Sequence, residues 1–553
     1  MSVRRDDASE RRDDWTERPD DSSERPDDSL QRRHAATERA VTRRELVRGL
    51  CLGAGPGLAL RWPAAALSSA LLIEACGGGG GGSGRLASPD GSTLHSTWAD
   101  PDGSGVLRVA AGEPLLARTE LAPASRRGAV LATLAHVTDA HVLDAQSPAR
   151  VPFLARLGPP FTSTFRPHET LTAQVLAGAL EAVGALRPDA VIQGGDLIDN
   201  AQANELAWAL LALAGGSVVA ASGGPGYHGV QEAGNPDPLY YRPDLDAPRH
   251  PTLLADAVRR FTSPGLRGPW YPVLGDHDLL VAGVVPPSPL SAGIAVGSRA
   301  VWELPADLPA HIGTLAQGSA SAPDGLGDPS AIGGLVSNLL GSAGVDVPAD
   351  ARRAELPASS VIARLRAASG AAGGGPELDY SFDVGDRVRV IVLDLVRRGG
   401  GSGGIVHPGQ PAWLASELVA AGERTVVVFS HQPLDTTAAG PGLLAELDRS
   451  PHVLAAIWGH THRNRITPRP GPGGGYWLIS TASLVDFPQQ SRALRVVETA
   501  GGIALETWML DHVSPAGGLG EISRELAYLD AQGGRPQGFA GGRADRNAVL
   551  YTS

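Results

Sequence analysis

Aspartate and histidine residues follow five short apolar runs of this chain, close to the point where each run ends. The runs are rich in Val, Ile and Leu and have the length of buried strands. The clusters that follow them are Thr138-Asp139-Ala140-His141, Gly194-Gly195-Asp196-Leu197-Ile198-Asp199-Asn200, Gly275-Asp276-His277-Asp278, Ser430-His431-Gln432-Pro433 and Gly459-His460-Thr461-His462. Carboxylates and imidazoles are oxygen and nitrogen ligands for metals and common proton carriers in catalysis. A site of this chemistry is therefore expected where the five strand ends meet.

The elements that would position these clusters alternate between strand and helix patterns. The expected strands are 130–137, 190–193, 270–274, 388–395, 425–429, 453–458 and 476–480, and helical patterns cover 171–186, 203–213, 253–261 and 410–420. Alternation of this kind predicts an α/β protein whose sheets are covered by helices. In such folds, ligands bind at the carboxyl ends of the strands, where the five clusters would lie.

Composition excludes several other classes of protein. The chain has 553 residues and a formal net charge of −12, which argues against a general binder of nucleic acid or anionic membranes. Its only two cysteines are Cys51 and Cys76, so a disulfide scaffold or a cysteine-ligated zinc site is excluded after residue 76. Lysine is absent, so all 47 basic residues are arginine. Any metal ligands must therefore come from His, Asp, Glu, Asn or the backbone.

Changes in amino-acid composition along the chain divide it into five segments. Residues 1–41 are charged and almost free of apolar side chains, which predicts a disordered extension. Residues 42–76 have the pattern of an export signal, and 77–129 are interpreted as a flexible linker and lead-in. The main domain is expected over 130–510, with an insertion at about 284–375 that is helical near 359–368. Residues 511–553 would form a C-terminal extension that packs on this domain.

The export segment is similar to a twin-arginine signal. Arg43-Arg44 is followed by Leu46 and then by a mostly apolar stretch up to Ala75. A short buried helix or a membrane-spanning helix is the alternative, but Arg61, Pro63 and several glycines argue against a membrane span. Cys76 weakly resembles a lipoprotein cleavage site, whereas simple cleavage with a glycine tether is the other possibility. The sequence thus predicts export across the cytoplasmic membrane by the twin-arginine machinery, to the cell envelope or beyond, with optional lipid anchoring at Cys76.

The ordered set of clusters resembles the calcineurin-like metallophosphoesterase superfamily, whose pattern is D-x-H, G-D-x-x-D, G-N-H-D/E, H and G-H-x-H. The resemblance covers roughly residues 130–485. Further stretches that fit it are Tyr380-Ser381-Phe382, Leu393-Asp394 and Gln410-Pro411-Ala412-Trp413-Leu414. The wide gaps between clusters, the export signal and Asp511-His512 are similar to a bacterial branch with long inserts. The resemblance implies an α/β fold, a two-sheet β-sandwich flanked by helices with large insertions.

The same resemblance implies a site with two divalent transition-metal ions, such as Mn, Fe, Zn or Ni. Asp139, His141, Asp196 and His462 would hold the first ion. Asp196 would also bridge to the second ion, which Asp276, His431 and His460 would complete. The reaction implied is attack of a metal-bound hydroxide on a phosphate mono- or diester. His277 would protonate the leaving oxygen and Asp278 would orient its imidazole, while Asp199 and Asn200 would support the ligands.

Several assignments stay open on the sequence alone. Asp278 could instead be an ordinary turn cap, and Asp199 could bind metal directly. Asn204 could reach the site, His136 is expected to be buried, and His407 is expected at the surface.

The family has Asn where this chain has Asp276, a change that should tighten metal binding and reduce the Lewis acidity of the ion. This departure favours the alternative function, a non-catalytic, metal-stabilised binding protein of the cell envelope. The leading expectation remains an exported phosphoesterase, with the insertion at 284–375 forming a substrate wall.

Overall fold

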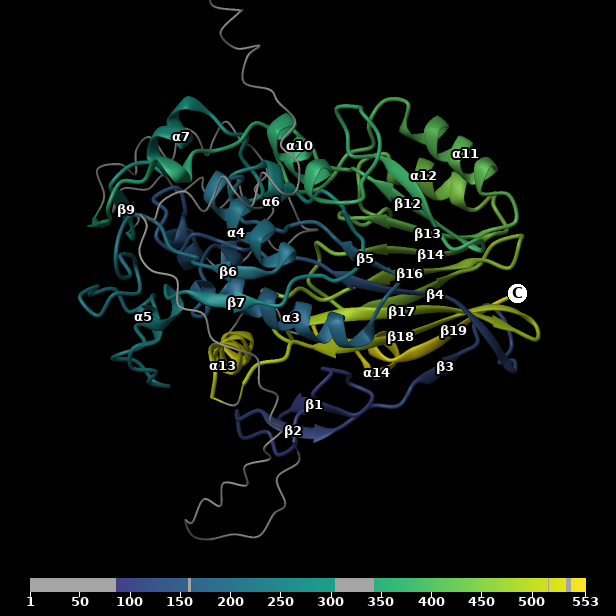
Figure 1. Ribbon diagram of the computed structural model, residues 1–553, viewed down its shortest axis with the longest axis horizontal. Helices are drawn as coiled ribbons and strands as arrows, with labels where there is room; N and C mark the ends of the chain where they lie inside the picture. Colours follow the sequence, from purple (N-terminus) through teal and green to yellow (C-terminus); the bar gives the residue numbers. More distant parts are fainter. Residues whose placement is uncertain (1–85, 158–160, 304–342, 516, 534–538) are drawn as a thin grey trace, which may run out of the picture. The chain divides into compact units, whose positions relative to one another are not determined.

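The computed structural model describes residues 86–157, 161–303, 343–515, 517–533 and 539–553 (Figure 1). Internal contacts divide the chain into residues 1–68 and 69–553, and the described residues all belong to the second unit. The expected disordered extension, the export segment with Cys51 and Cys76, and the central part of the insertion lie outside the described residues. Within the described residues, no helix is both long and apolar enough to cross a membrane.

A seven-stranded mixed sheet carries three of the five polar clusters. In spatial order, its strands are β3 (Leu116–Arg118), β19 (Ala548–Thr552), β18 (Gly502–Asp511), β17 (Gln490–Thr499), β4 (Arg127–Val137), β5 (Ala190–Gln193) and β8 (Trp270–Pro272). β4, β5 and β8 are parallel, so their carboxyl ends lie at one edge of the sheet. β17 and β18 form a long antiparallel hairpin beside β4.

A six-stranded sheet carries the other two clusters. Its order is β11 (Tyr380–Val384), β12 (Val388–Leu393), β13 (Thr425–Ser430), β14 (Val453–Trp458), β16 (Tyr476–Ser480) and β15 (Arg465–Arg469). The four inner strands are parallel, whereas β11 and β15 run antiparallel at the two edges. His431 therefore follows β13 at the same edge at which His460 and His462 follow β14.

Alternation of side chains along the six-stranded sheet separates two hydrophobic cores. Val390, Val427 and Ile457 face the seven-stranded sheet and belong to the larger core, whereas the alternating residues Ile391 and Val428 face the opposite way. Helices α11 (Gln410–Ala421) and α12 (Gly440–Leu447) cover that opposite face. Helices α3 (Thr172–Leu186) and α4 (Ala203–Ala214) belong to the larger core, and α3 packs against β17 and β18 (Figure 1). The two sheets thus form a sandwich flanked by helices.

Smaller elements surround this sandwich. Two-stranded sheets are formed by β1 (Ser96–Ala99) with β2 (Arg108–Ala111), β6 (Gly216–Val218) with β7 (Phe261–Ser263), and β9 (Arg299–Val301) with β10 (Gly344–Asp346). The remaining α-helices are α5 (Leu253–Ala257), α6 (Asp276–Leu279), α7 (Pro289–Ala295), α10 (Ala358–Ala368), α13 (Leu519–Gln532) and α14 (Arg543–Arg546). Short 3-10 helices are η1 (Pro152–Leu157), η2 (Phe161–Thr164), η3 (Glu169–Leu171) and η5 (Ala351–Arg353).

The expected α/β class is confirmed, and the seven strands expected from apolar runs all form, with ends shifted by no more than a few residues. One helical expectation is partly wrong. The pattern at 253–261 forms a helix only up to Ala257, and Phe261 starts β7, because that strand pairs with β6. Helix α10 coincides with the helical stretch expected in the insertion.

Candidate metal centre

The five polar clusters converge where the carboxyl ends of parallel strands from both sheets meet. β4, β5 and β8 of the seven-stranded sheet lead to Asp139, Asp196 and Asp276. β13 and β14 of the other sheet lead to His431 and to the pair of histidines in the last cluster. A backbone contact joins the two groups of loops, because the N–H of His460 donates to Oδ1 of Asp139 over 3.0 Å. The seven side chains expected as metal ligands are therefore brought together.

The first metal position consists of Asp139, His141 and His462. One ligand atom from each lies within 4.8 Å of the others, and all three residues are buried. Nε2 of His462 lies 3.2 Å from Oδ1 of Asp139. This spacing leaves the three atoms facing a common centre, as coordination of a cation requires.

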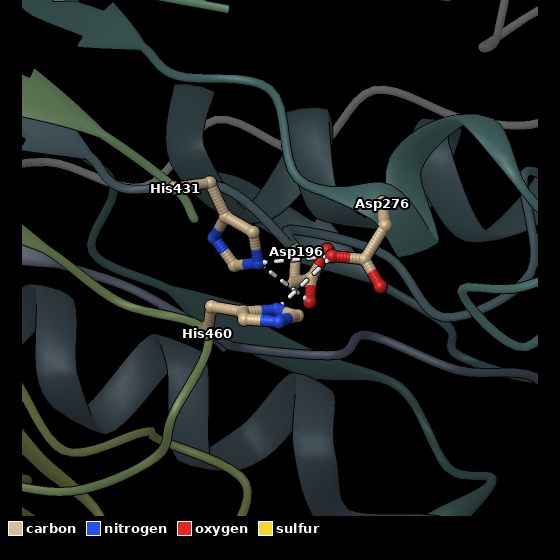
Figure 2. Close-up of side chains that lie close together, drawn as sticks. All are labelled: Asp196, Asp276, His431 and His460. Carbon is tan, nitrogen blue, oxygen red and sulfur yellow. Dashed lines mark ion pairs between the residues drawn. The ribbon is translucent and has the colours of Figure 1, made fainter. Parts of the chain in front are cut away.

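The second metal position consists of Asp196, Asp276, His431 and His460, which are drawn in Figure 2. Nε2 of His431 lies 3.0 Å from Oδ2 of Asp196 and 3.4 Å from Oδ1 of Asp276. His460 faces the same carboxylate through Nδ1, at 3.2 Å from Oδ1 of Asp276. Two carboxylates and two imidazoles thus surround one point.

Asp196 connects the two positions. Its Oδ2, which lies beside His431, is also 3.7 Å from Nε2 of His141 in the first position. Asp196 further belongs to a third group of ligand atoms, with His141 and His277. The geometry therefore agrees with a carboxylate shared between two cations, the role that the sequence predicted for Asp196.

The chemistry of the donor atoms fits two divalent cations. Buried atoms without a hydrogen-bond partner include Nε2 of His141, His431 and His462 and Oδ2 of Asp276. Leaving such atoms unpaired is costly, and a bound cation would satisfy them. Burial lowers the pKa of His462, but the negative charges of Asp139 and Asp486 outweigh this effect and raise the pKa to about 10. The electrostatic potential at the centre is thus strongly negative, as expected for a cation site.

Backbone strain is concentrated at the ligands. Five of the seven ligand residues have positive φ angles: Asp139 (53°), His141 (41°), Asp196 (47°), His460 (61°) and His462 (53°). Such conformations cost roughly 1–3 kcal/mol each and are kept where the surrounding structure imposes them. They turn short side chains back toward the centre immediately after each strand.

Glycine neighbours make this close packing possible. A Cβ at Gly195, whose φ is 95°, would lie 2.4 Å from Nδ1 of His431, and one at Gly459 would lie 2.4 Å from Oδ2 of Asp139. Any larger residue at either position would displace a ligand.

Outer hydrogen bonds fix three of the four ligand imidazoles. Nδ1 of His141 donates to Oδ1 of Asp199 over 2.9 Å, and Nδ1 of His462 donates to Oδ2 of Asp486 over 2.6 Å. Nδ1 of His431 donates to the backbone oxygen of Gly194 over 2.9 Å. These contacts set the ring orientation and leave Nε2 as the ligand atom. Asp199 therefore lies where it can orient His141, as the first of its two expected roles requires.

His277 and Asp278 are both buried beside the second position, but they are not paired as expected. Nδ1 of His277 lies 2.8 Å from the backbone oxygen of Asp199 and 3.4 Å from its Oδ1. The carboxylate of Asp278 instead accepts the backbone N–H groups of Leu197, Ile198 and Gly275. Asp278 thus takes its alternative role as a turn cap, and Asp199 orients His277. Burial and the nearby charge of Asp196 raise the pKa of Asp278 to about 7.

The other residues considered from the sequence lie outside the two positions. Asn200 supports Asp199, since its Nδ2 donates to Oδ2 of that residue over 2.9 Å. Asn204 donates to Asp144 rather than to a ligand. His136 is buried, with Nδ1 3.0 Å from Oγ1 of Thr481, and burial lowers its pKa to about 3. Half-buried His407 lies 3.1 Å from Nη1 of Arg398.

Two supporting residues were missed from the sequence. Gln432 donates from Nε2 to Oδ1 of Asp276 over 3.0 Å, and Asp486 holds His462 as described. Gln432 directly follows a ligand histidine, which was the available signal. Asp486 lies six residues beyond the end of β16, so the pattern of a polar cluster next to a strand end did not include it.

No family model and no curated protein sequence matches the chain. Similar solved structures include a dimetal phosphatase from Danio rerio, with 13% identity, a TM-score of 0.36, and coverage of 70% of this chain and 100% of that one. A purple acid phosphatase from yellow lupin (Lupinus luteus) seeds has 11% identity, a TM-score of 0.28, and coverage of 73% and 55%. The sulfate thiohydrolase SoxB of Thermus thermophilus has 13% identity, a TM-score of 0.26, and coverage of 75% and 62%.

Proposed function

We propose that the chain is a hydrolase of phosphate esters that uses two divalent transition-metal ions, such as Mn, Fe, Zn or Ni. The observation that carries this proposal is the pair of adjoining ligand clusters that share Asp196, with His277 beside them. When bound, two such ions would lower the pKa of a shared water molecule and neutralise charge on the phosphoryl oxygens. The chain contains no lysine that could neutralise the phosphoryl oxygens, so the ions would supply a larger share of the positive charge around them.

The residues of the chain would hold the reactants and move one proton. His277 would donate a proton to the leaving oxygen, following general acid logic. The backbone oxygen of Asp199 holds Nδ1 of His277, so Nε2 would be the atom that donates. Because Asp199 also holds His141, the proton donor and one metal ligand are oriented by the same residue.

Metal analysis combined with an activity assay tests this proposal. We expect the purified protein to carry about two transition-metal ions per chain and to hydrolyse an aryl phosphate monoester or diester. Removal of the ions should abolish the activity, and added Mn²⁺ should restore it. A folded sample that contains no metal and is not activated by any added divalent ion would exclude the proposed function.

The insertion at 284–375 would form a wall of the substrate site and select between monoesters and diesters. Its residues Ala354 and Leu356 make backbone hydrogen bonds with Ala203 and Ala201, next to the loop that carries Asp199 and Asn200. Loops of this kind, on a rigid scaffold, commonly determine specificity. A panel of nucleotides, phospholipid head-group esters and sugar phosphates would identify the preferred class.

A non-catalytic, metal-stabilised binding protein of the cell envelope is the second candidate function. The observation that favours it is Asp276, which adds a third carboxylate to the centre. Extra negative charge would tighten metal binding and reduce the Lewis acidity of the ions. If only Asp276→Asn hydrolyses esters and the parent does not, the second candidate is supported.

Export is proposed from the sequence of residues 42–76. Replacement of Arg43 and Arg44 by lysine should retain the precursor in the cytoplasm, as measured by cell fractionation. Mass spectrometry of the mature N-terminus would distinguish lipidation of Cys76 from simple cleavage, and Cys76→Ser should abolish any lipid anchor. Cytoplasmic parent protein with an intact N-terminus would contradict export.

A further inference from the structure

The two metal positions offer the same number and kind of inner ligands. The first position has one carboxylate of its own, Asp139, and two imidazoles, His141 and His462. The second position likewise has one carboxylate of its own, Asp276, and two imidazoles. Asp196 is shared between them. The inner ligands alone would therefore give the two positions similar affinities for the same ion.

The surroundings of the imidazoles differ between the two positions. Both imidazoles of the first position donate to buried carboxylates, His141 to Asp199 and His462 to Asp486. In the second position, His431 donates to a neutral backbone oxygen instead. Among the described residues, His460 forms an ion pair only with the inner ligand Asp276. A carboxylate behind an imidazole makes the ring a more basic ligand and fixes its orientation.

A single buried glutamate joins the two outer carboxylates. Glu169 accepts from Nη1 of Arg150, whose Nε lies 4.0 Å from Oδ2 of Asp199. Glu169 also accepts the backbone N–H of Arg166 over 3.1 Å. The guanidinium of Arg166 in turn donates to both oxygens of Asp486, over 2.7 and 3.2 Å. All of these residues are at least nine-tenths buried.

These contacts link both outer carboxylates of the first position to Glu169. Hydrogen bonds run from His462 through Asp486 and Arg166 to Glu169 and Arg150, and an ion pair of 4.0 Å continues from Arg150 to Asp199, which holds His141. Breaking a buried, hydrogen-bonded ion pair by removing one partner is strongly unfavourable, which keeps the network in a single arrangement. No such network reaches the second position among the described residues.

We propose that Glu169 is a positioning residue that makes the first metal position bind its ion more tightly than the second, so that the two positions load in order. This inference rests on the proposed two-metal function. It makes the first ion a resident part of the structure and the second ion the one that exchanges.

Metal titration of the chelator-treated full chain tests the loading order without any activity assay. Zn²⁺, competed against a chromophoric chelator, should bind the parent in two resolved steps that differ by about tenfold or more. Glu169→Gln should weaken the tighter step by about tenfold to a hundredfold and leave the weaker step unchanged. Asp486→Asn, which keeps a hydrogen-bond acceptor for His462, should weaken the same step and serves if Glu169→Gln fails to fold.

Two further variants complete the experiment. Glu506→Gln is the matched control, because Glu506 is likewise a buried glutamate in ion pairs with arginine, here Arg127 and Arg495, but among the described residues it contacts no ligand. It should leave both steps unchanged. Asp276→Asn should weaken only the second step.

The outcomes separate this inference from the proposed function. A single step in the parent, or equal weakening of both steps by Glu169→Gln, would overturn the loading order while leaving a two-metal hydrolase intact. Two ordered steps in a protein without phosphoesterase activity would support the loading order and contradict the hydrolase. Absence of Zn²⁺ uptake by the folded parent would overturn both.

Discussion

Nδ1 of His277 lies 2.8 Å from the backbone oxygen of Asp199, which fixes the imidazole edge-on to that of His141, with ring centroids 4.5 Å apart. This contact occupies Nδ1 of His277, just as hydrogen bonds occupy Nδ1 of His141, His431 and His462, whose Nε2 atoms face the carboxylates of the centre. His277 also belongs to a group of potential ligand atoms with His141 and Asp196. Its role as proton donor or as ligand therefore has to be tested directly.

His277→Ala should keep both metal ions and lose catalytic rate. Loss of a general acid costs roughly 10²–10⁴-fold, and the loss should be largest for esters with poor leaving groups, because these most need protonation. His460→Ala should instead lose the ion of the second position. Metal content and kcat for aryl phosphates of increasing leaving-group pKa would be measured for both variants. Equal metal loss in the two variants would identify His277 as a ligand.

Asp276→Asn should weaken metal retention at the second position and raise the turnover of the fully loaded enzyme several-fold. A neutral amide oxygen withdraws less of the positive charge of the ion than a carboxylate does, so the ion remains the stronger Lewis acid. Kinetics in excess Mn²⁺ would be compared with metal content after dialysis. Asp276→Ala, which lacks a donor oxygen, should lose both the metal and the activity. Unchanged metal retention in Asp276→Ala would contradict a ligand role for this carboxylate.

The ligand candidates could be predicted from the sequence because each follows an apolar run, and parallel strands bring their carboxyl ends to one edge. The role of Asp278 could not, although it is adjacent to His277 in the chain. Asp278 lies in the first turn of α6, where its carboxylate accepts the N–H of Gly275 and is no longer directed at the imidazole. Asp486 and Arg166, which hold His462, are 320 residues apart, so only the folded chain shows that they meet.

The two hairpin strands beside β4 also could not be predicted from the sequence. β17 and β18 are ten residues each, yet neither was among the strands expected from apolar runs. β17 begins with buried Gln490, Ser491 and Arg492, so it does not form a continuous apolar run. Arg492 is fully buried and donates to the side-chain oxygens of Thr481 and Asn464. Polar burial of this kind depends on tertiary partners, which a hydrophobic pattern does not reveal.

Gly283→Ala should lower kcat as well as stability. The φ angle of Gly283 is 71°, and an added Cβ would lie 2.4 Å from Nε2 of His277 and 2.7 Å from Oδ2 of Asp276. Gly385→Ala is the matched control, because its φ is 59° and no atom lies within 4 Å of the added Cβ. Gly385→Ala should lose about 1 kcal/mol of unfolding free energy from the positive φ, and Gly283→Ala should lose more because His277 and Asp276 must move, but only Gly283→Ala should lose kcat. Equal kcat in the two variants would contradict the assigned position of His277.

Chelation should lower the melting temperature of the parent by several degrees, and added Zn²⁺ should restore it. Asp139, Asp196 and Asp276 are buried close together, so their mutual repulsion is relieved by bound cations. A ligand present at a hundredfold excess over its Kd stabilises a protein by about 2.7 kcal/mol. The shift would be measured by calorimetry with and without EDTA. Asp196→Asn should show a smaller shift, and identical melting of the parent in both conditions would argue against a structural contribution of the ions.

Glu355 should make the stability of the insertion depend on pH. Burial raises the pKa of Glu355 from its ordinary value of 4.5 to about 7, although Ser291 donates to its Oε2 over 2.7 Å. Below pH 4.5 the carboxyl is protonated in both states, so the shift has no effect on stability. Between pH 4.5 and 7 the unfolded chain releases the proton first, so this group lowers the free energy of unfolding as the pH rises.

Glu355→Gln removes this titration and keeps an acceptor for Ser291. The variant should therefore be more stable than the parent by about 2 kcal/mol at pH 8, and this difference should vanish near pH 4.5. Urea unfolding at both pH values would measure it. Glu181→Gln, at an exposed position of α3, is the control and should leave the free energy of unfolding unchanged at both pH values. A Glu355→Gln variant that is less stable than the parent at pH 8 would show that the ionised carboxylate is stabilising, because its hydrogen bonds would then outweigh the cost of burial.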